Sequence, residues 1–168
     1  GNKLFEIVHE AAKEFNASVI APNTIRTIEG GLLSYQSDFG REHNPYTIGL
    51  DRLVDVDQDV DFIGKEALKK IKEDGISEKL VGVEIDGDPI QKAPENFWPV
   101  FDLNSNKIGR LSRCFYSPRL KKNIGLAIID IKFSEPGTSL VIESPNAHLN
   151  AQVHELPWFP AEKSTNLD

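Results

Sequence analysis

Residues 28–39 (IEGGLLSYQSDF) contain the residue types that a small polar ligand would need. Two carboxylates, Glu29 and Asp38, accompany a tyrosine, Tyr35, and a pair of adjacent glycines. Glycine lets a ligand approach the backbone closely. Tyrosine offers an aromatic face with a polar end, and a carboxylate accepts hydrogen bonds from ring N–H groups. The same residues also fit a helix end followed by a buried leucine pair, so the stretch alone leaves both interpretations open.

A second candidate is the segment 107–122, where the charge reverses sign in an otherwise acidic chain. No acidic residue occurs between Asn104 and Asn123. The cations of this segment are Lys107, Arg110, Arg113, Arg119, Lys121 and Lys122. Arginine forks and lysine point charges suit carboxylate ligands, and a turn at Ser117-Pro118 would orient them. A solvated hairpin whose charges face water is the alternative.

Several other chemistries lack the residues they need. The four histidines show no metal-ligand spacing, and neither a phosphate-binding glycine loop nor a nucleophile elbow is present. The single cysteine, Cys114, excludes an intrachain disulfide, which favours a reducing compartment, and we expect the cytoplasm. Its place in a strand pattern predicts a buried, inert thiol. The net charge of -7 argues against nonspecific binding to nucleic acid or to an anionic membrane.

The elements that position the first candidate lie in residues 1–76, which mix helical and extended patterns. Apolar residues at helical spacing predict helices near 3–15 and 64–74. A short helix with the body IRTIE is expected after a cap at Asn23 or Thr24, with Gly30 and Gly31 ending it. The apolar run ASVIA at 17–21 predicts a short buried strand, and an extended run is expected up to Val56.

Residues 77–168 show a different pattern, with no convincing helix. Short alternating apolar runs are separated by Asn-Ser-Asn, Ser-Pro, Glu-Pro-Gly and Ser-Pro-Asn turns. Such a series is typical of a small antiparallel barrel or sandwich. We therefore predict an α+β protein with two domains, an α/β layer over 1–76 and a small antiparallel β-barrel over 77–168.

Several motifs, in order along the chain, resemble the folate-dependent aminomethyltransferases, which include the T-protein of the glycine cleavage system. The motifs are R-x-x-E-x-G-x-x-x-Y-x-x-D from Arg26, N-P-Y-x-x-G-L from Asn44, DFIGKEAL from Asp61 and KIGRLSRCFYSPRLKKNIGLAIID from Lys107. The resemblance extends from about residue 18 to residue 160. Three segments are most similar to the tetrahydrofolate-dependent demethylases of dimethylsulfoniopropionate, namely IEGGLLSYQSD, NPYTIGLDRLVD and DFIGKEALK.

The resemblance implies three structural parts around a central folate channel. This chain would supply the end of the second part, a ferredoxin-like α/β layer, and all of the third, the barrel. The first part, with its catalytic aspartate and most pterin contacts, would be missing. We therefore expect a fragment without a catalytic residue of its own, inactive alone, whose partner is the missing N-terminal part of the same enzyme.

The resemblance also implies the chemistry, which is transfer of a one-carbon group to N5 of tetrahydrofolate. Positions matching the family's folate site are Glu29, Tyr35, Arg110, Arg113, Ser117, Arg119 and Lys121, and those near the substrate are Asn23 and Arg26. T-proteins carry Ala-Arg-Asp where this chain has Pro22-Asn23-Thr24, so an arginine that helps to hold their substrate is absent. We therefore expect a small-molecule methyl donor, a sulfonium such as dimethylsulfoniopropionate. The alternatives are aminomethyl transfer of the glycine-cleavage type and a non-catalytic folate-binding or scaffold module.

Overall fold

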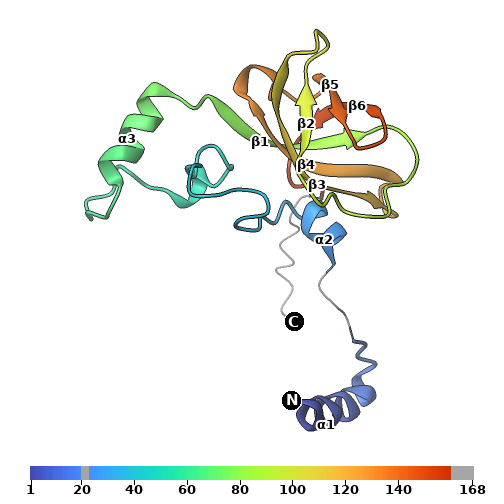
Figure 1. Cartoon of the computed structure of the whole chain (residues 1–168). Coiled ribbons are helices and arrows are strands. Elements are labelled where there is room, and N and C mark those ends of the chain that lie inside the picture. The colour runs from blue at the N-terminus through green and yellow to red at the C-terminus, as the bar shows by residue number, and fades with distance from the viewer. Residues whose placement is uncertain (20–22, 160–168) are drawn as a thin grey trace.

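The computed structural model describes residues 1–19 and 23–159 (Figure 1). The helices are α1 (Asn2–Ala12), α2 (Thr24–Glu29) and α3 (Lys65–Asp74), with the 3-10 turns η1 (Lys13–Phe15), η2 (Asp51–Leu53) and η3 (Ile131–Phe133). The strands are β1 (Glu78–Ile85), β2 (Trp98–Phe101), β3 (Lys107–Ser117), β4 (Lys122–Asp130), β5 (Ser139–Glu143) and β6 (His148–His154). Strands are therefore confined to the second half of the described chain.

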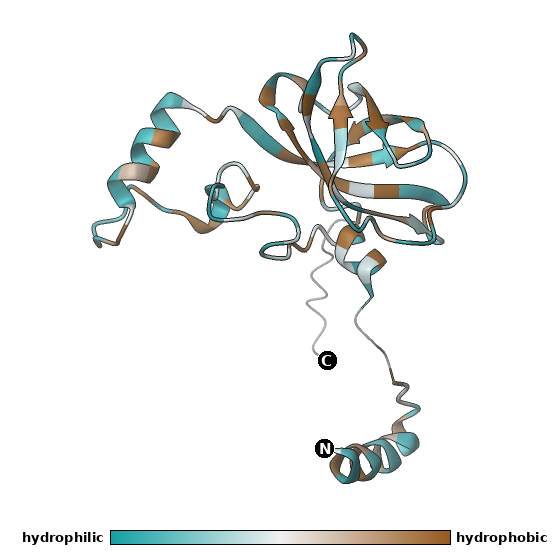
Figure 2. Cartoon of the chain, in the orientation of Figure 1, coloured by the Kyte–Doolittle hydropathy of each residue, from teal (hydrophilic) through white to brown (hydrophobic). Residues whose placement is uncertain are grey.

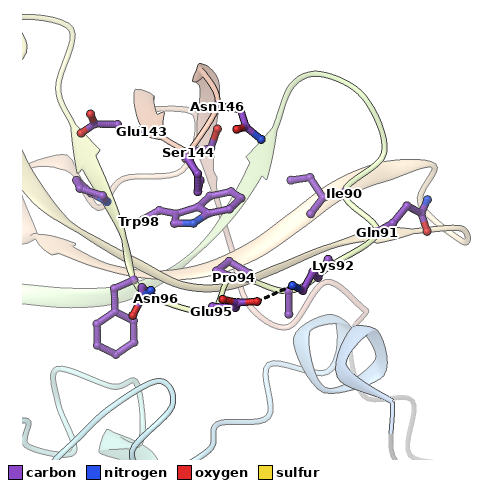
Figure 3. Close-up of a pocket in the computed structure, with 14 residues that line it drawn as sticks. Ile90, Gln91, Lys92, Pro94, Glu95, Asn96, Trp98, Glu143, Ser144 and Asn146 are labelled. Carbon is purple, nitrogen blue, oxygen red and sulfur yellow. Dashed lines mark hydrogen bonds and ion pairs between the residues drawn. The ribbon is translucent and has the colours of Figure 1, made fainter.

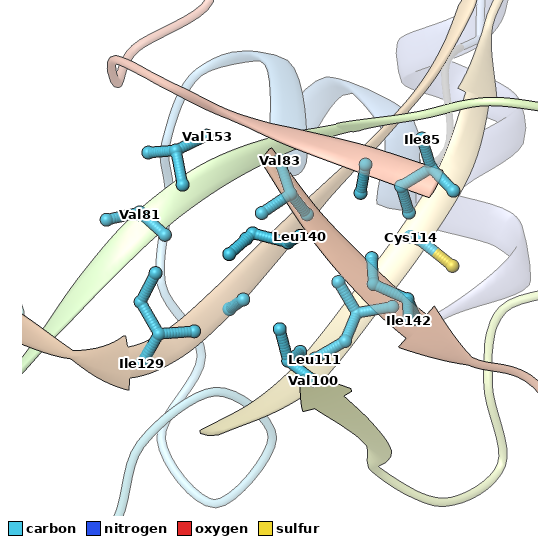
Figure 4. Close-up of a cluster of buried hydrophobic side chains, with 12 residues drawn as sticks. Val81, Val83, Ile85, Val100, Leu111, Cys114, Ile129, Leu140, Ile142 and Val153 are labelled. Atoms are coloured by element: carbon cyan, nitrogen blue, oxygen red, sulfur yellow. The ribbon is translucent and has the colours of Figure 1, made fainter. Parts of the chain in front are cut away.

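These strands close into an antiparallel barrel in the order β1-β4-β3-β2-β5-β6, with β6 returning to β1. Side chains alternate between the two faces of a strand, and β5 shows this directly, because Leu140 and Ile142 are buried while Ser139 and Glu143 are exposed. The inward residues form one core, part of which is shown in Figure 4. The prediction of a small antiparallel barrel is confirmed.

Strand β4 is apolar on both faces because both are covered. Ala127 and Ile129 belong to the barrel core, whereas Ile124 and Leu126 face outward and pack against helix α2. A continuous apolar run is the expected sequence for a strand buried on two sides. This outer cluster therefore fixes where α2, and the chain that follows it, meets the barrel.

Gly109 is required where β3 lies close to β4. A Cβ atom at Gly109 would lie 2.2 Å from the carbonyl oxygen of Ile128 and 2.7 Å from the Cα of Ile129, so the backbone itself would have to move. We predict that Gly109→Ala lowers the free energy of unfolding by about 1–3 kcal/mol, measured by urea unfolding. Ser139→Ala at an exposed position of β5 is the control, with an expected change within about 0.5 kcal/mol. Equal midpoints for the two variants would contradict this packing.

In the first half of the chain, the structure contains the helices predicted from the sequence but not the predicted strands. The helices expected near 3–15 and 64–74 are confirmed as α1 with η1, and as α3. Within residues 1–19 and 23–76, however, the only β pairing is an isolated bridge between Tyr35 and Phe39.

The strands expected before the barrel are the main correction to the predicted fold. Residues 17–19 are not a strand, the rest of the expected strand 17–21 lies outside the described residues, and η2 interrupts the extended run toward Val56. A strand needs a partner to satisfy its backbone hydrogen bonds, and the described residues provide none here. The α/β layer is thus present only in part. The division at 76/77, just before β1, remains a prediction.

Candidate functional site

Residues 28–39 lie where the first half of the chain meets the barrel. The side chain of Asn23 caps α2 by accepting a hydrogen bond from the amide of Ile25 at 3.0 Å. The helix ends at Gly30, and Gly31 takes a φ of 62°, which favours glycine, directly against Pro157. The two glycines therefore end the helix as predicted and turn the chain across the outside of the barrel.

Glu29 connects the end of α2 to the turn between β3 and β4 through its side-chain contacts. Its carboxylate is buried, with the Ser117 hydroxyl donating to Oε1 at 2.6 Å and the Arg119 guanidinium 3.5 Å from Oε2. The carbonyl of Glu29 accepts from the amide of Trp158 at 3.0 Å. The Glu29 carboxylate is thus held by a hydroxyl and a guanidinium of the β3–β4 turn.

Asp38 and Arg113 form a buried ion pair that holds the 28–39 turn on β3. Asp38 is fully buried, and its carboxylate accepts from Arg113 Nε at 2.7 Å and Nη2, from Ser112 Oγ at 2.8 Å and from the amide of Ser34 at 2.7 Å. A buried charge is tolerated when it is paired and hydrogen-bonded in this way. We name these side chains, Asp38, Arg113 and Ser112, the Asp38 cluster.

A bulge in β3 makes the Asp38 cluster possible. The register against β4 shifts between Leu111 and Arg113, so Ser112 is the extra residue. A bulge re-aims side chains that would otherwise alternate between the faces. Ser112 and Arg113 are consecutive in sequence, yet both contact Asp38.

The remaining donors of Arg113 are also used within the protein. Nη1 donates to the Thr27 hydroxyl and Nη2 to the carbonyl of Leu32, each at 2.9 Å. Arg113 is among the predicted folate-binding cations, and in this structure its guanidinium joins α2, the turn and the barrel.

Arg110 connects two further segments next to the Asp38 cluster. Its guanidinium lies 4.7 Å from the centre of the Phe97 ring and 3.5 Å from the carboxylate of Glu42. The Nε atom is buried and has no hydrogen-bond partner among the described residues. Arg110 therefore faces the first half of the chain rather than open solvent.

The other predicted site residues are more exposed. Tyr35 is half exposed and meets the Phe39 ring edge-on at 5.7 Å. Arg119 stacks over the Phe159 ring at 3.9 Å. Lys121, at the β3–β4 turn, and Arg26, on α2, are exposed. The structure thus gathers most of these residues around the junction of α2, the 28–39 turn and β3.

One expectation about the turn is wrong. The leucine pair after the helix end, Leu32 and Leu33, was expected to be buried. Leu33 packs against the outer cluster, but Leu32 is 61% exposed. The chain has left the helical conformation at Gly31, where φ is 62°. Leu32 contributes its carbonyl to Arg113 instead.

Two cavities flank the loop 93–97. The smaller, of about 440 Å³, borders the junction and includes Thr24, Gln36, Ser112 and Arg113 in its wall. The larger, of about 930 Å³, lies on the other side, between this loop and the β5–β6 turn, where Trp98 and Ile90 line it (Figure 3). Only the smaller cavity contacts a residue that the sequence assigned to a site.

Sequence reasoning missed Ser112 and Thr27 as parts of this junction. Both are small hydroxyl residues without a local motif, and their partners are distant in sequence, with Ser112 and Asp38 separated by 74 positions. A bulge has no reliable sequence signal in a strand of this kind. Their roles follow only from the three-dimensional structure.

Cys114 is fully buried in the barrel core, as predicted. Burial raises the pKa of its thiol to about 12. We predict that a thiol reagent at pH 8 labels the folded chain at least about a hundredfold more slowly than the urea-unfolded chain. Since the folded pKa is the higher one, the thiol's contribution to stability is complete below about pH 8.5 and falls as the pH rises toward 12. Labelling at equal rates in both states would contradict this burial.

Two features are absent from the residues that the structure describes. Residues 1–19 and 23–159 contain no group of three or more His, Cys, Asp or Glu side chains placed to hold a metal ion. In the same part of the chain, every helix is too short or too polar to cross a bilayer.

The fold and the junction together indicate the class of protein domain. The protein has a closed antiparallel barrel with a short helix packed on its outer face and a buried ionic junction between them. Residues 78–160 match the family described as "Glycine cleavage T-protein C-terminal barrel domain". The barrel half of the chain belongs to this domain family.

Known relatives extend the similarity across most of the chain. The aminomethyltransferase of Geobacillus sp. (strain WCH70) is 37% identical over 164 residues, which cover 95% of this chain and 43% of that protein. The aminomethyltransferase of Caldanaerobacter subterraneus subsp. tengcongensis is 38% identical over 159 residues, covering 93% of this chain and 41% of the relative. The chain is therefore similar to aminomethyltransferases over most of its own length, and it spans less than half of theirs.

A solved structure agrees on the fold. The glycine cleavage system aminomethyltransferase T from Bartonella henselae superimposes with a TM-score of 0.70 at 20% identity, over 79% of this chain and 36% of that one. The identity is low, so this likeness concerns the fold alone.

Proposed function

We propose that the chain is the C-terminal part of a tetrahydrofolate-dependent aminomethyltransferase of the glycine-cleavage type. The similarity to aminomethyltransferases over 95% of the chain carries this proposal. The sequence motifs are consistent with it, because Glu29 and Asp38 both bond to residues of the barrel at one junction. Activity belongs to the assembled enzyme, in which this chain would provide one wall of the folate channel.

The Asp38 cluster and Glu29 narrow the roles of the candidate residues. Arg113 bonds to Asp38, and Ser117 bonds to Glu29, so we assign Arg113, Ser117 and Glu29 the task of positioning the rim. Tyr35 and Lys121 are exposed beside it and have no side-chain hydrogen bond to another described residue. We therefore propose these two as direct ligand contacts, Tyr35 for an aromatic ring and Lys121 for a carboxylate.

The reaction requires N5 of tetrahydrofolate to attack the donated carbon while the bond from that carbon to its leaving group breaks. Alignment of two reactants can contribute about 7–11 kcal/mol to lowering the barrier. A rigid rim is suited to this task, and the buried ion pair of Asp38 with Arg113 provides rigidity. The residues of this chain would thus act by binding and orientation.

The donor is the part of the proposal on which sequence motifs and relatives differ. The motifs favour a sulfonium methyl donor, whereas the relatives described above are aminomethyltransferases. We give the aminomethyl donor first place. The sulfonium donor is the second candidate because Pro22-Asn23-Thr24 stands where T-proteins carry the substrate-binding arginine. A cytoplasmic location, expected from the single cysteine, is likewise proposed.

A chimeric enzyme tests this proposal. The aligned 43% of the Geobacillus aminomethyltransferase is replaced by this chain, and one-carbon transfer to tetrahydrofolate is assayed with an aminomethyl and a sulfonium donor. We expect transfer from the aminomethyl donor that requires both halves. Transfer from the sulfonium alone would favour the second candidate. A folded chimera that binds tetrahydrofolate and transfers neither group would support a non-catalytic folate-binding module.

A further inference from the structure

Helix α1, extended by the turn η1, presents a broad apolar face to solvent. Its large apolar side chains are mostly exposed, with Leu4 at 67%, Phe5 at 55%, Ile7 and Val8 at 58% and Phe15 at 80%. At 100° per residue these positions, with Ala11 and Ala12, fall within an arc of about 160°. The brown stripe on α1 in Figure 2 shows this segregation.

This face lacks a partner within the described chain. No residue of α1 is buried, and among the described elements its contacts are chiefly with the adjoining η1. A helix of this length is marginal in water by itself, and most helical stability in proteins comes from packing of the apolar face. A sequence that segregates its apolar residues so strictly is therefore suited to a covered position.

We propose that the α1 face binds the amino-terminal part of the aminomethyltransferase architecture. The relatives are more than twice as long as the aligned region, which covers 43% of the Geobacillus protein. The barrel half matches a C-terminal domain, so the additional length of the relatives precedes it. Helix α1 is the element of this chain nearest to that junction in sequence.

The polar face of α1 argues against a membrane as the occupant. It carries Lys3 and Lys13 against Glu6, Glu10 and Glu14. An interfacial helix for an anionic membrane is rich in Lys and Arg on its polar face. The acidic excess here fits a protein surface and opposes attraction to anionic lipid.

This inference depends on the similarity to the aminomethyltransferases and not on the proposed one-carbon transfer. A failure to bind the amino-terminal part can therefore be distinguished from a failure of catalysis. The probe is the part of the Geobacillus aminomethyltransferase that precedes the aligned 43%, produced as a separate polypeptide. The aligned part of the same Geobacillus enzyme serves as the positive control. Affinity for this chain is measured by titration, and amide hydrogen exchange reports on residues 2–15.

We expect a complex in which the amides of α1 become protected at least about tenfold. Val8→Glu, in the centre of the apolar face, should weaken binding by about tenfold or more, equivalent to about 1.4 kcal/mol. Glu6→Gln, on the polar face, is the matched control and should change the affinity less than twofold. Because no residue of α1 is buried, neither variant should alter unfolding of the barrel.

Three results would overturn the inference. The first is no complex with this chain while the aligned part of the Geobacillus enzyme binds the probe. The second is a complex that leaves α1 unprotected or tolerates Val8→Glu. The third is protection of α1 without the probe, either by self-association that Val8→Glu abolishes or by vesicles containing phosphatidylserine.

Discussion

Replacement of Asp38 by alanine is expected to lower the free energy of unfolding by about 3–5 kcal/mol, because it leaves the Arg113 guanidinium buried without its counterion. Asp38 is fully buried and the Arg113 side chain is only 14% exposed, so water cannot replace the lost carboxylate without rearrangement. The loss also removes the acceptor of the Ser112 hydroxyl and the Ser34 amide. Urea unfolding of the chain, followed by tryptophan fluorescence, measures the effect.

An exposed ion pair provides the control for this variant. Lys122 and Glu84 lie 2.7 Å apart with side chains 51% and 26% exposed. Exposed pairs contribute about 0–1 kcal/mol, so Lys122→Ala should lower stability by no more than that. If Asp38→Ala were as mild as Lys122→Ala, the junction would not depend on the Asp38 cluster.

The second large effect is expected on ligand affinity. Tyr35→Ala in the chimeric enzyme should weaken tetrahydrofolate binding by about tenfold, equivalent to about 1.4 kcal/mol, if the half-exposed ring contacts the ligand. The barrel should unfold unchanged, since the described ring contact of Tyr35 is with Phe39. Isothermal titration gives the affinity of each variant.

Leu53→Ala is a matched surface control for the tyrosine variant. Leu53 is also in the first half of the chain and is 66% exposed, but it belongs to η2, outside the 28–39 turn. Its removal should leave tetrahydrofolate affinity within twofold of the parent chimera. Equal affinities for Tyr35→Ala and the parent would remove Tyr35 from the proposed contacts.

The barrel could be predicted from the sequence because its determinants are local. Alternation along β5 and the doubly buried run of β4 each specify their own environment, and turn residues separate the strands. Helix α3 could be predicted in the same way, from its apolar residues at helical spacing and from the glycine that ends it. The strand at 17–21 was not, because an apolar run becomes a strand only when another strand pairs with it.

The residues of the candidate site could be proposed from the sequence, but their contacts with one another could not. Residue types left a structural interpretation of the 28–39 stretch and of the basic segment open, and the family resemblance favoured a folate site. The pairing of Arg113 with Asp38 joins positions 75 apart and depends on the bulge at Ser112, which sequence alone does not reveal. A folate-facing arginine and a structural one have the same sequence signature. Their difference lies in which acceptors the fold brings near.

The central claim is that the junction of α2, the 28–39 turn and the β3–β4 turn is a wall of the folate channel. The most direct test is a crystal structure of the chimeric enzyme with tetrahydrofolate. We predict ligand atoms within about 3.5 Å of the Tyr35 ring or hydroxyl or of the Lys121 ammonium, with the Asp38–Arg113 pair intact beneath them. Tetrahydrofolate bound without contact to residues 23–39 or 110–121 would contradict the account.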